Sequence, residues 1–217
     1  MRAITVTVGP LAAASANNIA LSQSVVGASA VVLNGSTASG GVATLDTARR
    51  VLITSAGNDS GITFTITGTN WSGSSISEVL TGGNIAAVPS VLDYATVTSI
   101  KTSGSTASTI TVGTNGVAAS PWARMDEYMW PDVSIQCNVT GTVIYTVQST
   151  LDDPNDASNA VAAASVVWVN TTDTLAVNAT TSLQTNFGFT PRWFRVLLNS
   201  GTGSVRSVVY QAGSLHS

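Results

Sequence analysis

Alternation of apolar and polar residues is the dominant pattern along the chain, and a period of two is typical of β-strands. In the first half the alternating segments are separated by turns rich in Gly, Ser and Asn. The predicted strands are Ile4 to Val8, Ala30 to Leu33, Arg50 to Thr54, Ile62 to Thr67, Ile76 to Leu80, Ala95 to Ile100 and Thr109 to Val112. Strands that recur about every ten residues, with turns between them, predict a β-sandwich.

The clearest predicted hairpin covers residues 62–80. Ile62, Phe64 and Ile66 point to one face of its first strand, and the intervening threonines point to the other. The turn that precedes it, Ala56 to Gly61, contains the Asn, Asp and Gly residues that tolerate positive φ or close an Asx turn.

A second series of strands begins after residues 114–121, where small residues and Pro121 indicate a short linker. Aromatic residues are concentrated after this boundary. The predicted strands are Val133 to Val139, Thr142 to Gln148, Val166 to Asn170, Trp193 to Leu198 and Ser204 to Gln211. The Ala-rich stretch Asn159 to Ser165 fits a helical turn and a loop equally well.

We therefore predict an all-β protein with two antiparallel β-sandwich domains, Ig-like or jelly-roll-like, and an extended N-terminal segment. Residues 1–44 are expected to form a strand and an extended arm. Residues 45–117 form the first sandwich, to which strands from 1–44 can belong, and residues 121–217 form the second, aromatic-rich sandwich. The stretch Leu11 to Gly41 is poor in large side chains, so we expect this arm to order against a neighbouring subunit.

Composition supports the strand prediction and excludes several classes of protein. The 217 residues include 28 Ser and 30 Thr, and β-branched residues favour a pleated surface over a helix. Charged residues are 9% of the chain, and the net charge is −3. Binding to nucleic acid through phosphate contacts needs a basic face, so no nucleic-acid partner is expected. Hydrophobic residues reach 44%, which argues against disorder.

Cys137 is the single cysteine, so an intrachain disulfide is excluded. It shares a strand face with Val133, Ile135 and Val139, which predicts a buried thiol that acts as a small hydrophobe. The N-terminus alternates like a strand and lacks a signal-peptide core, and apolar runs are too short to span a membrane. We therefore expect synthesis in a cytoplasm and no membrane partner.

Residues with catalytic or ligand-binding chemistry are scarce. His216, the single histidine, is one residue from the C-terminus, where a catalytic or metal site is not expected. Lys101 ends a predicted strand and is expected to be a solvated charge. The sequence has no cysteine pair for zinc and no phosphate-binding glycine loop. We predict no enzymatic activity, no cofactor, and no catalytic, cofactor-binding or metal-binding residues.

Carboxylates form two clusters. Three acids fall within Asp152 to Asp156, in a loop that follows a strand; such oxygen-rich loops can bind calcium, but the composition favours an ordinary turn. The other cluster, Asp126 and Glu127, lies among tryptophans and suggests a sugar-cleaving pair. Adjacent residues on a strand point to opposite faces, however, and Arg124 is available to Asp126, so a structural ion pair is favoured.

The aromatic residues admit two interpretations. Exposed Trp122, Trp130 or Trp168 would provide platforms on which sugar rings stack. The segment Pro191 to Leu198 carries apolar bulk on both strand faces, which instead favours core or subunit-interface roles for most of them.

Several of these segments resemble structural proteins of tailed-bacteriophage virions. The resemblance is carried by Arg49 to Thr69, Ser77 to Gly82, Tyr94 to Ile100 and Thr111 to Gly116, and in the second half by Val143 to Pro154 and Arg195 to Gly203. It covers most of residues 45–217 and contains no enzymatic signature.

The resemblance implies a non-enzymatic virion protein, made in the bacterial host cytoplasm. The leading hypothesis is a capsid decoration (cement) protein that stabilises the head lattice, as a homo-oligomer (a trimer) in contact with the major capsid protein. One alternative is a tail or head-to-tail adaptor subunit in contact with tail or connector proteins. Another is a receptor- or carbohydrate-binding virion module, and cleavage of glycans through Asp126 or Glu127 is the least favoured.

Overall fold

The computed structural model describes residues 3–126 and 132–211, and in this part the chain is all-β with antiparallel sheets. Its helical segments are two single 3-10 turns, η1 (Ala163–Ser165) and η2 (Thr174–Ala176). The chain forms two compact units. Unit 1 contains residues 1–11 and 117–217, and unit 2 contains residues 12–116. The chain therefore passes between the units twice.

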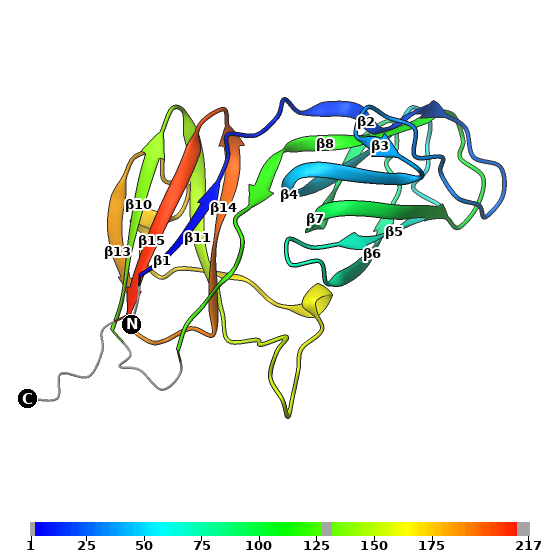
Figure 1. The fold of residues 1–217 in the computed structure, drawn as a ribbon. Helices are drawn as coiled ribbons and strands as arrows, with labels where there is room; N and C mark the ends of the chain where they lie inside the picture. Colours follow the sequence, from blue (N-terminus) through cyan, green and yellow to red (C-terminus); the bar gives the residue numbers. More distant parts are fainter. Residues whose placement is uncertain (1–2, 127–131, 212–217) are drawn as a thin grey trace, which may run out of the picture. The chain divides into compact units, whose positions relative to one another are not determined.

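Unit 2 is built around two long strands, β4 (Val42–Ser55) and β7 (Ala87–Thr102), which pair with each other (Figure 1). The strands follow the order β8-β4-β7-β5-β6, while β2 pairs with β8 and β3 with β4. The remaining strands are β2 (Ser15–Gln23), β3 (Ala38–Ser39), β5 (Thr63–Thr69), β6 (Ser75–Thr81) and β8 (Ile110–Ala119), the last three residues of which belong to unit 1.

The predicted hairpin at residues 62–80 is confirmed, because β5 and β6 pair from Thr63–Thr81 to Thr69–Ser75. Phe64 and Ile66 are buried on its inner face. The turn is stabilised by Asn70, whose Oδ1 accepts hydrogen bonds from the backbone N–H groups of Ser72 and Ser74. An Asn side chain that replaces backbone acceptors in this way is typical of a tight turn.

The stretch predicted as an extended arm, residues 11–41, finds partners within its own chain. β2 pairs with β8, and Gly35 and Thr37 donate backbone hydrogen bonds to Ile19 and Asn18. A glycine in β8 makes the close approach of β2 possible, because a Cβ on Gly113 would lie 1.8 Å from the Ser15 carbonyl oxygen. The missing side chain at Gly113 lets β2 approach the sheet, and β2 also buries Ile19 and Ala20 completely.

Arg49 is the largest fully buried side chain among the described residues of unit 2, with an exposed fraction of 1%. Its Nη1 donates to the Ala12 carbonyl and to Asp46 Oδ1, both at 3.0 Å, and its Nη2 donates to the Asn115 carbonyl at 2.6 Å. The backbone N–H of Ala12 donates to Asp46 Oδ2 in turn. One guanidinium therefore ties β4 to both segments through which the chain enters and leaves unit 2.

Unit 1 consists of two sheets that share one core. The first has the strand order β1-β15-β10-β13, and the second has the order β12-β11-β14, with β9 and the end of β8 also paired to β14 (Figure 1). The strands are β1 (Ile4–Val8), β9 (Ala123–Arg124), β10 (Val133–Thr140), β11 (Val143–Thr150), β12 (Val169–Asn170), β13 (Leu183–Phe187), β14 (Trp193–Gly201) and β15 (Ser204–Gln211).

The core of unit 1 follows from strand alternation. Every second residue of β10 and β15 is buried against inward-facing residues of β11 and β14. Tyr145, Phe194 and Phe187 are its largest members, and Cys137 lies among them. The aromatic enrichment that the sequence shows after residue 121 therefore includes these core side chains.

Two predicted strands are wrong or shorter in the structure. Residues 30–33 form only a single bridge, Ala30 to Lys101, because the Gln23 side chain occupies both the N–H and the carbonyl of Val32. Residues 166–168 are also outside a strand, since the Val167 N–H donates to Asp152 Oδ2. In both places a side chain replaces the backbone partner that a strand would need.

Candidate functional site

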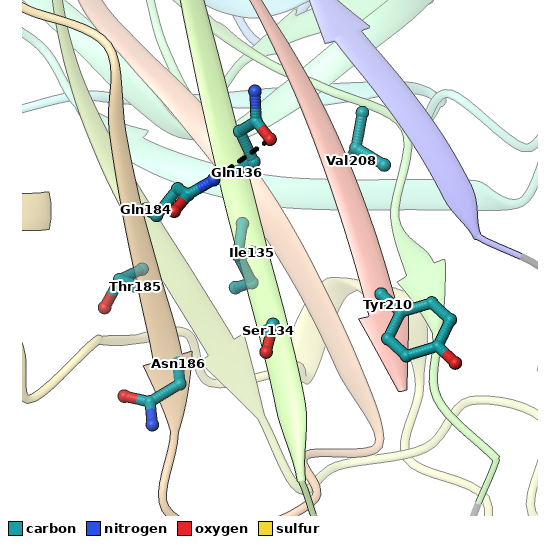
Figure 2. A pocket seen from close by; sticks show the side chains of 8 residues that line it. All are labelled: Ser134, Ile135, Gln136, Gln184, Thr185, Asn186, Val208 and Tyr210. Atoms are coloured by element: carbon teal, nitrogen blue, oxygen red, sulfur yellow. Dashed lines mark hydrogen bonds between the residues drawn. The ribbon is translucent and has the colours of Figure 1, made fainter. Parts of the chain in front are cut away.

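A polar groove of about 430 Å³ lies on the outer face of the β1-β15-β10-β13 sheet of unit 1 (Figure 2). We call it the Ser134 groove. The residues that line it are Ser134, Ile135, Gln136, Gln184, Thr185, Asn186, Val208 and Tyr210. Its volume falls within the range of about 300–1,000 Å³ that is typical of small-ligand sites.

Strand alternation places this set of side chains on one face. Val133, Ile135 and Cys137 of β10 point into the core, so Ser134 and Gln136 point outward. The pairing register then brings their neighbours into two cross-strand rows. One row is Asn186, Ser134 and Tyr210, and the other is Gln184, Gln136 and Val208.

The depression arises because the smallest side chain stands in the middle of its row. Ser134 lies between Asn186 of β13 and Tyr210 of β15, which are both longer and both exposed. Neighbouring strands are about 4.8 Å apart, and residues two positions apart along a strand are separated by about 6.8 Å. The two rows of side chains in Figure 2 therefore form a small grid, with the short Ser134 side chain between Asn186 and Tyr210.

Hydrogen bonds orient one row and leave the other available. Gln184 Nε2 donates to Gln136 Oε1 at 3.2 Å, and Gln136 Nε2 donates to Asn138 Oδ1 at 2.9 Å. Within the described residues the side chains of Ser134, Asn186 and Tyr210 make no hydrogen bond. Each amide has two donors and a carbonyl acceptor, so the groove offers donors and acceptors side by side. No charged side chain lines it among the residues that the structure describes.

The tryptophans that the sequence suggested as sugar platforms pack against each other and against arginines. The Trp122 ring meets Trp168 at a centroid distance of 5.0 Å and Trp193 at 6.1 Å, both edge-on. The Arg195 guanidinium lies 4.4 Å from the centroid of the Trp168 ring. These contacts favour the structural interpretation of Trp122 and Trp168. Trp130 lies outside the described residues.

The carboxylates of the loop Asp152 to Asp156 are engaged by donors of the chain itself. Asp153 is buried and accepts hydrogen bonds from Trp193 Nε1 and Arg124 Nη2, both at 3.0 Å. The backbone N–H groups of Ser158 and Asn159 donate to Asp156 and hold the pKa of its carboxyl below the ordinary value. This is the bonding of an ordinary turn, which the sequence favoured over a calcium loop.

The expected partner of Arg124 differs from the one in the structure. Arg124 forms its ion pair with Asp153, whereas the sequence suggested Asp126. The backbone of Asp126 exchanges two hydrogen bonds with the Gln211 side chain. Glu127, the other half of the suggested acidic pair, and His216 lie outside the described residues.

The prediction for Cys137 is confirmed. Its side chain is fully buried, and the sulfur lies 3.2 Å from Ser207 Oγ. Burial raises the pKa of the thiol, despite hydrogen bonds with Ser207 and Tyr145 that act in the opposite direction. Such a thiol is a poor nucleophile. Lys101 is exposed on β7, as expected.

The Ser134 groove is the feature that sequence reasoning missed. The alternation of Ser134 and Gln136 with buried residues was visible, and it indicates an outward polar face. The partners on β13 and β15 were not visible, because pairing between distant strands carries no local signal. A sequence search for small residues between long polar ones on predicted strands would have found Ser134 but not its neighbours.

Comparison with known proteins adds no assignment, since no family model, curated protein or solved structure matches the chain. The described residues contain no group of three or more His, Cys, Asp or Glu side chains placed to hold a metal ion. Among these residues there is also no helix with the length and apolar character needed to cross a membrane.

Proposed function

We propose that the chain is a non-enzymatic structural protein of a tailed-bacteriophage virion, a capsid decoration (cement) protein that stabilises the head lattice. In this proposal it consists of two antiparallel sandwich domains with an extended N-terminal segment, is made in the bacterial host cytoplasm, and assembles as a homo-oligomer (a trimer). The all-β fold and the resemblance to virion proteins that the sequence suggests over most of residues 45–217 support it.

The observation that carries the proposal is an exposed apolar groove at one edge of unit 1. The groove measures about 190 Å³ and is lined by Leu151, Val169, Phe187 and Phe189, together with Ser149, Thr150 and residues 170–172. Leu151 is 67% exposed, Val169 60% and Phe189 44%. We call this the β12 groove.

Two properties of the β12 groove suit protein assembly. β12 is the last strand of its sheet, so its outer edge presents backbone groups that a partner strand can pair with. Clustered apolar side chains on a surface gain free energy when a protein partner covers them. The low charge of the chain adds little desolvation cost at such an interface. The proposed partners are copies of this chain and the major capsid protein.

A tail or head-to-tail adaptor subunit, in contact with tail or connector proteins, is the second candidate. It uses the same apolar edge but is present in few copies. Quantitative mass spectrometry of purified virions distinguishes the two candidates through the ratio of this chain to the major capsid protein. A ratio near one is expected for decoration of the lattice, a ratio far below one supports the adaptor, and absence from virions would overturn both.

The role of the β12 groove is tested by the substitution Val169→Asp, which places a charge at the centre of the proposed interface. We expect the variant to lose self-association and lattice binding in sedimentation experiments, because burial of an unpaired carboxylate is unfavourable. Val26→Asp is the matched control, since Val26 is an 84% exposed valine of unit 2. Equal behaviour of the two variants would remove the β12 groove from the proposal.

A further inference from the structure

The geometry points to the Ser134 groove as a binding site for a neutral oligosaccharide. The inference does not depend on the virion proposal, because it concerns a different face of unit 1 from the β12 groove. Its basis is the combination in one groove of amide groups, a hydroxyl, an exposed phenol ring and no charge.

The chemistry of the groove matches that of a sugar. Neighbouring hydroxyls of a sugar ring each donate and accept a hydrogen bond, and an amide side chain offers both functions with fixed spacing. Asn186 and Gln184 stand on one side of the groove and Gln136 at its centre, so amides lie at adjacent positions of the grid. Ser134 adds a hydroxyl at the floor. The hydroxyl groups of a sugar are thus ligand groups that these side chains can bind.

Tyr210 supplies the apolar part of the recognition. Its side chain is 52% exposed at the edge of the groove, and the cross-strand register places it beside Ser134. An exposed aromatic ring has an electron-rich face on which the C–H face of a sugar can stack, while its hydroxyl remains available for a hydrogen bond. Figure 2 shows Tyr210 on β15, on the opposite side of Ser134 from Asn186.

The hydrogen-bonded side chains of Gln184, Gln136 and Asn138 make part of the site rigid before a ligand binds. Two successive amide–amide hydrogen bonds fix the direction in which the Gln136 side chain points. A fixed side chain loses less conformational entropy on binding, so its hydrogen bonds contribute more to affinity. Ile135 and Cys137 of β10 are almost completely buried in the core and hold the backbone of this strand in place.

The lack of charge determines the class of ligand. Acidic sugars or phosphates would call for Arg or Lys in the site, which supply charge-assisted hydrogen bonds. Arg206 of β15 lies opposite Asn138, beyond the residues that line the groove. A neutral glycan is therefore the ligand that fits the described residues.

The test is affinity electrophoresis of the full chain in gels that contain a neutral polysaccharide. The probes are dextran, laminarin, yeast mannan and galactomannan, with alginate as the anionic comparison. We expect at least one neutral polysaccharide to retard the protein and alginate not to do so. Retardation by alginate alone, or by none of the probes, would overturn the inference.

Variants locate the binding. Tyr210→Ala and Asn186→Ala are expected to weaken binding by about tenfold, which corresponds to about 1.4 kcal/mol per side chain. Tyr210→Phe keeps the ring and should stay within about threefold of the parent chain. Leu175→Ala is the control, since Leu175 is a 77% exposed apolar residue of unit 1 that lines neither the Ser134 groove nor the β12 groove.

Thermal unfolding of each variant accompanies the binding measurement. Both substituted side chains are exposed, so unfolding midpoints should remain close to that of the parent chain. Binding that survives Tyr210→Ala and Asn186→Ala, or that falls equally in Leu175→Ala, would place the sugar elsewhere and contradict the inference. Because purified protein suffices, the result is independent of the copy number in virions.

Discussion

Unit 1 and unit 2 are both antiparallel β structures, but different side chains fill their interiors. In unit 1 the largest fully buried residues are Tyr145 and Phe194, which pack between two sheets. In unit 2 the largest is Arg49, whose guanidinium binds a carboxylate and two backbone carbonyls. Unit 2 also buries Tyr94 and Phe64, so the difference is that a buried, hydrogen-bonded charge is added there to aromatic packing.

The difference follows from what each unit must hold in place. Unit 1 can bring large side chains together because its two sheets face each other across one core. Unit 2 also has to fix residues 12–41, which contain few large side chains. Polar groups add to the burial of Ile19, Val25 and Val31 in holding this segment. Arg49 binds the Ala12 carbonyl, and Gln23 binds the backbone of Val32. Hydrogen bonds are directional, whereas dispersion is not, so hydrogen bonds can fix the backbone of a segment that has few large side chains.

Removal of the Arg49 side chain should have the largest effect. Arg49→Ala leaves the backbone carbonyls of Ala12 and Asn115 without this donor, and we expect a loss of about 3–5 kcal/mol in the free energy of unfolding. Hydrogen exchange followed by mass spectrometry should show lost protection in β4 and β8. Arg206→Ala, which alters an exposed arginine, is the control and should change stability by less than about 0.5 kcal/mol. Similar protection of β4 and β8 in the two variants would show that Arg49 does not hold these strands together.

Truncation of Phe194 is the counterpart in unit 1. Phe194→Ala creates a cavity in the shared core, and we expect a cost of about 3–5 kcal/mol with the loss of protection centred on β11 and β14. Phe189→Ala removes an exposed ring and should cost less than about 1 kcal/mol. If Phe194→Ala weakened β4 and β8 as strongly as β11 and β14, the contrast between the two units would be wrong.

A methyl group at Gly113 tests the attachment of β2 to the sheet. Gly113→Ala places a Cβ against the backbone of Ser15, and we expect a destabilisation of about 1–3 kcal/mol. Limited proteolysis should then cut residues 12–41 faster. Gly116→Ala in the same strand meets no atom within 4 Å, so it is a matched control that should leave cleavage unchanged. Equal cleavage of both variants would mean that β2 is held by other contacts.

The pH dependence of unfolding should show the smallest effect. Burial acts to raise the pKa of Asp46, but hydrogen bonds from the Ala12 N–H and from Arg49 outweigh it and hold the pKa below the ordinary value of 3.8. The carboxylate therefore stabilises the fold above about pH 4, and this contribution is lost as the pH falls through its folded-state pKa.

Asp46→Asn should accordingly reduce the loss of stability between pH 7 and pH 3, as measured by urea unfolding at both values. Some acid sensitivity should remain, because hydrogen bonds from Thr185 and Leu175 also lower the pKa of Asp173 in unit 1. An unchanged slope in the Asp46→Asn variant would exclude Asp46 as a source of the acid sensitivity.

Local pattern was sufficient for hairpins and for the burial of single positions. The strands at residues 62–80 and 204–211 and the inward orientation of Cys137 could be predicted, because a period of two depends only on neighbours along the chain. The long strands β4 and β7 were only partly predicted. Alternation fails at Ala48 and Arg49, which are both buried where the register shifts, so a search for strict alternation stops there.

The sequence by itself determined the all-β character of this protein, the positions of its clearest turns and which residues of many strands face inward. The tertiary structure alone decided that Arg49 lies inside unit 2, that Gly113 admits β2, and that Asn186 and Tyr210 flank Ser134. The physical reason is the range of the interactions. Side-chain periodicity depends on residues that are close in the sequence. The contacts of Arg49 and the Ser134 groove depend on which strands become neighbours, and the whole fold decides that.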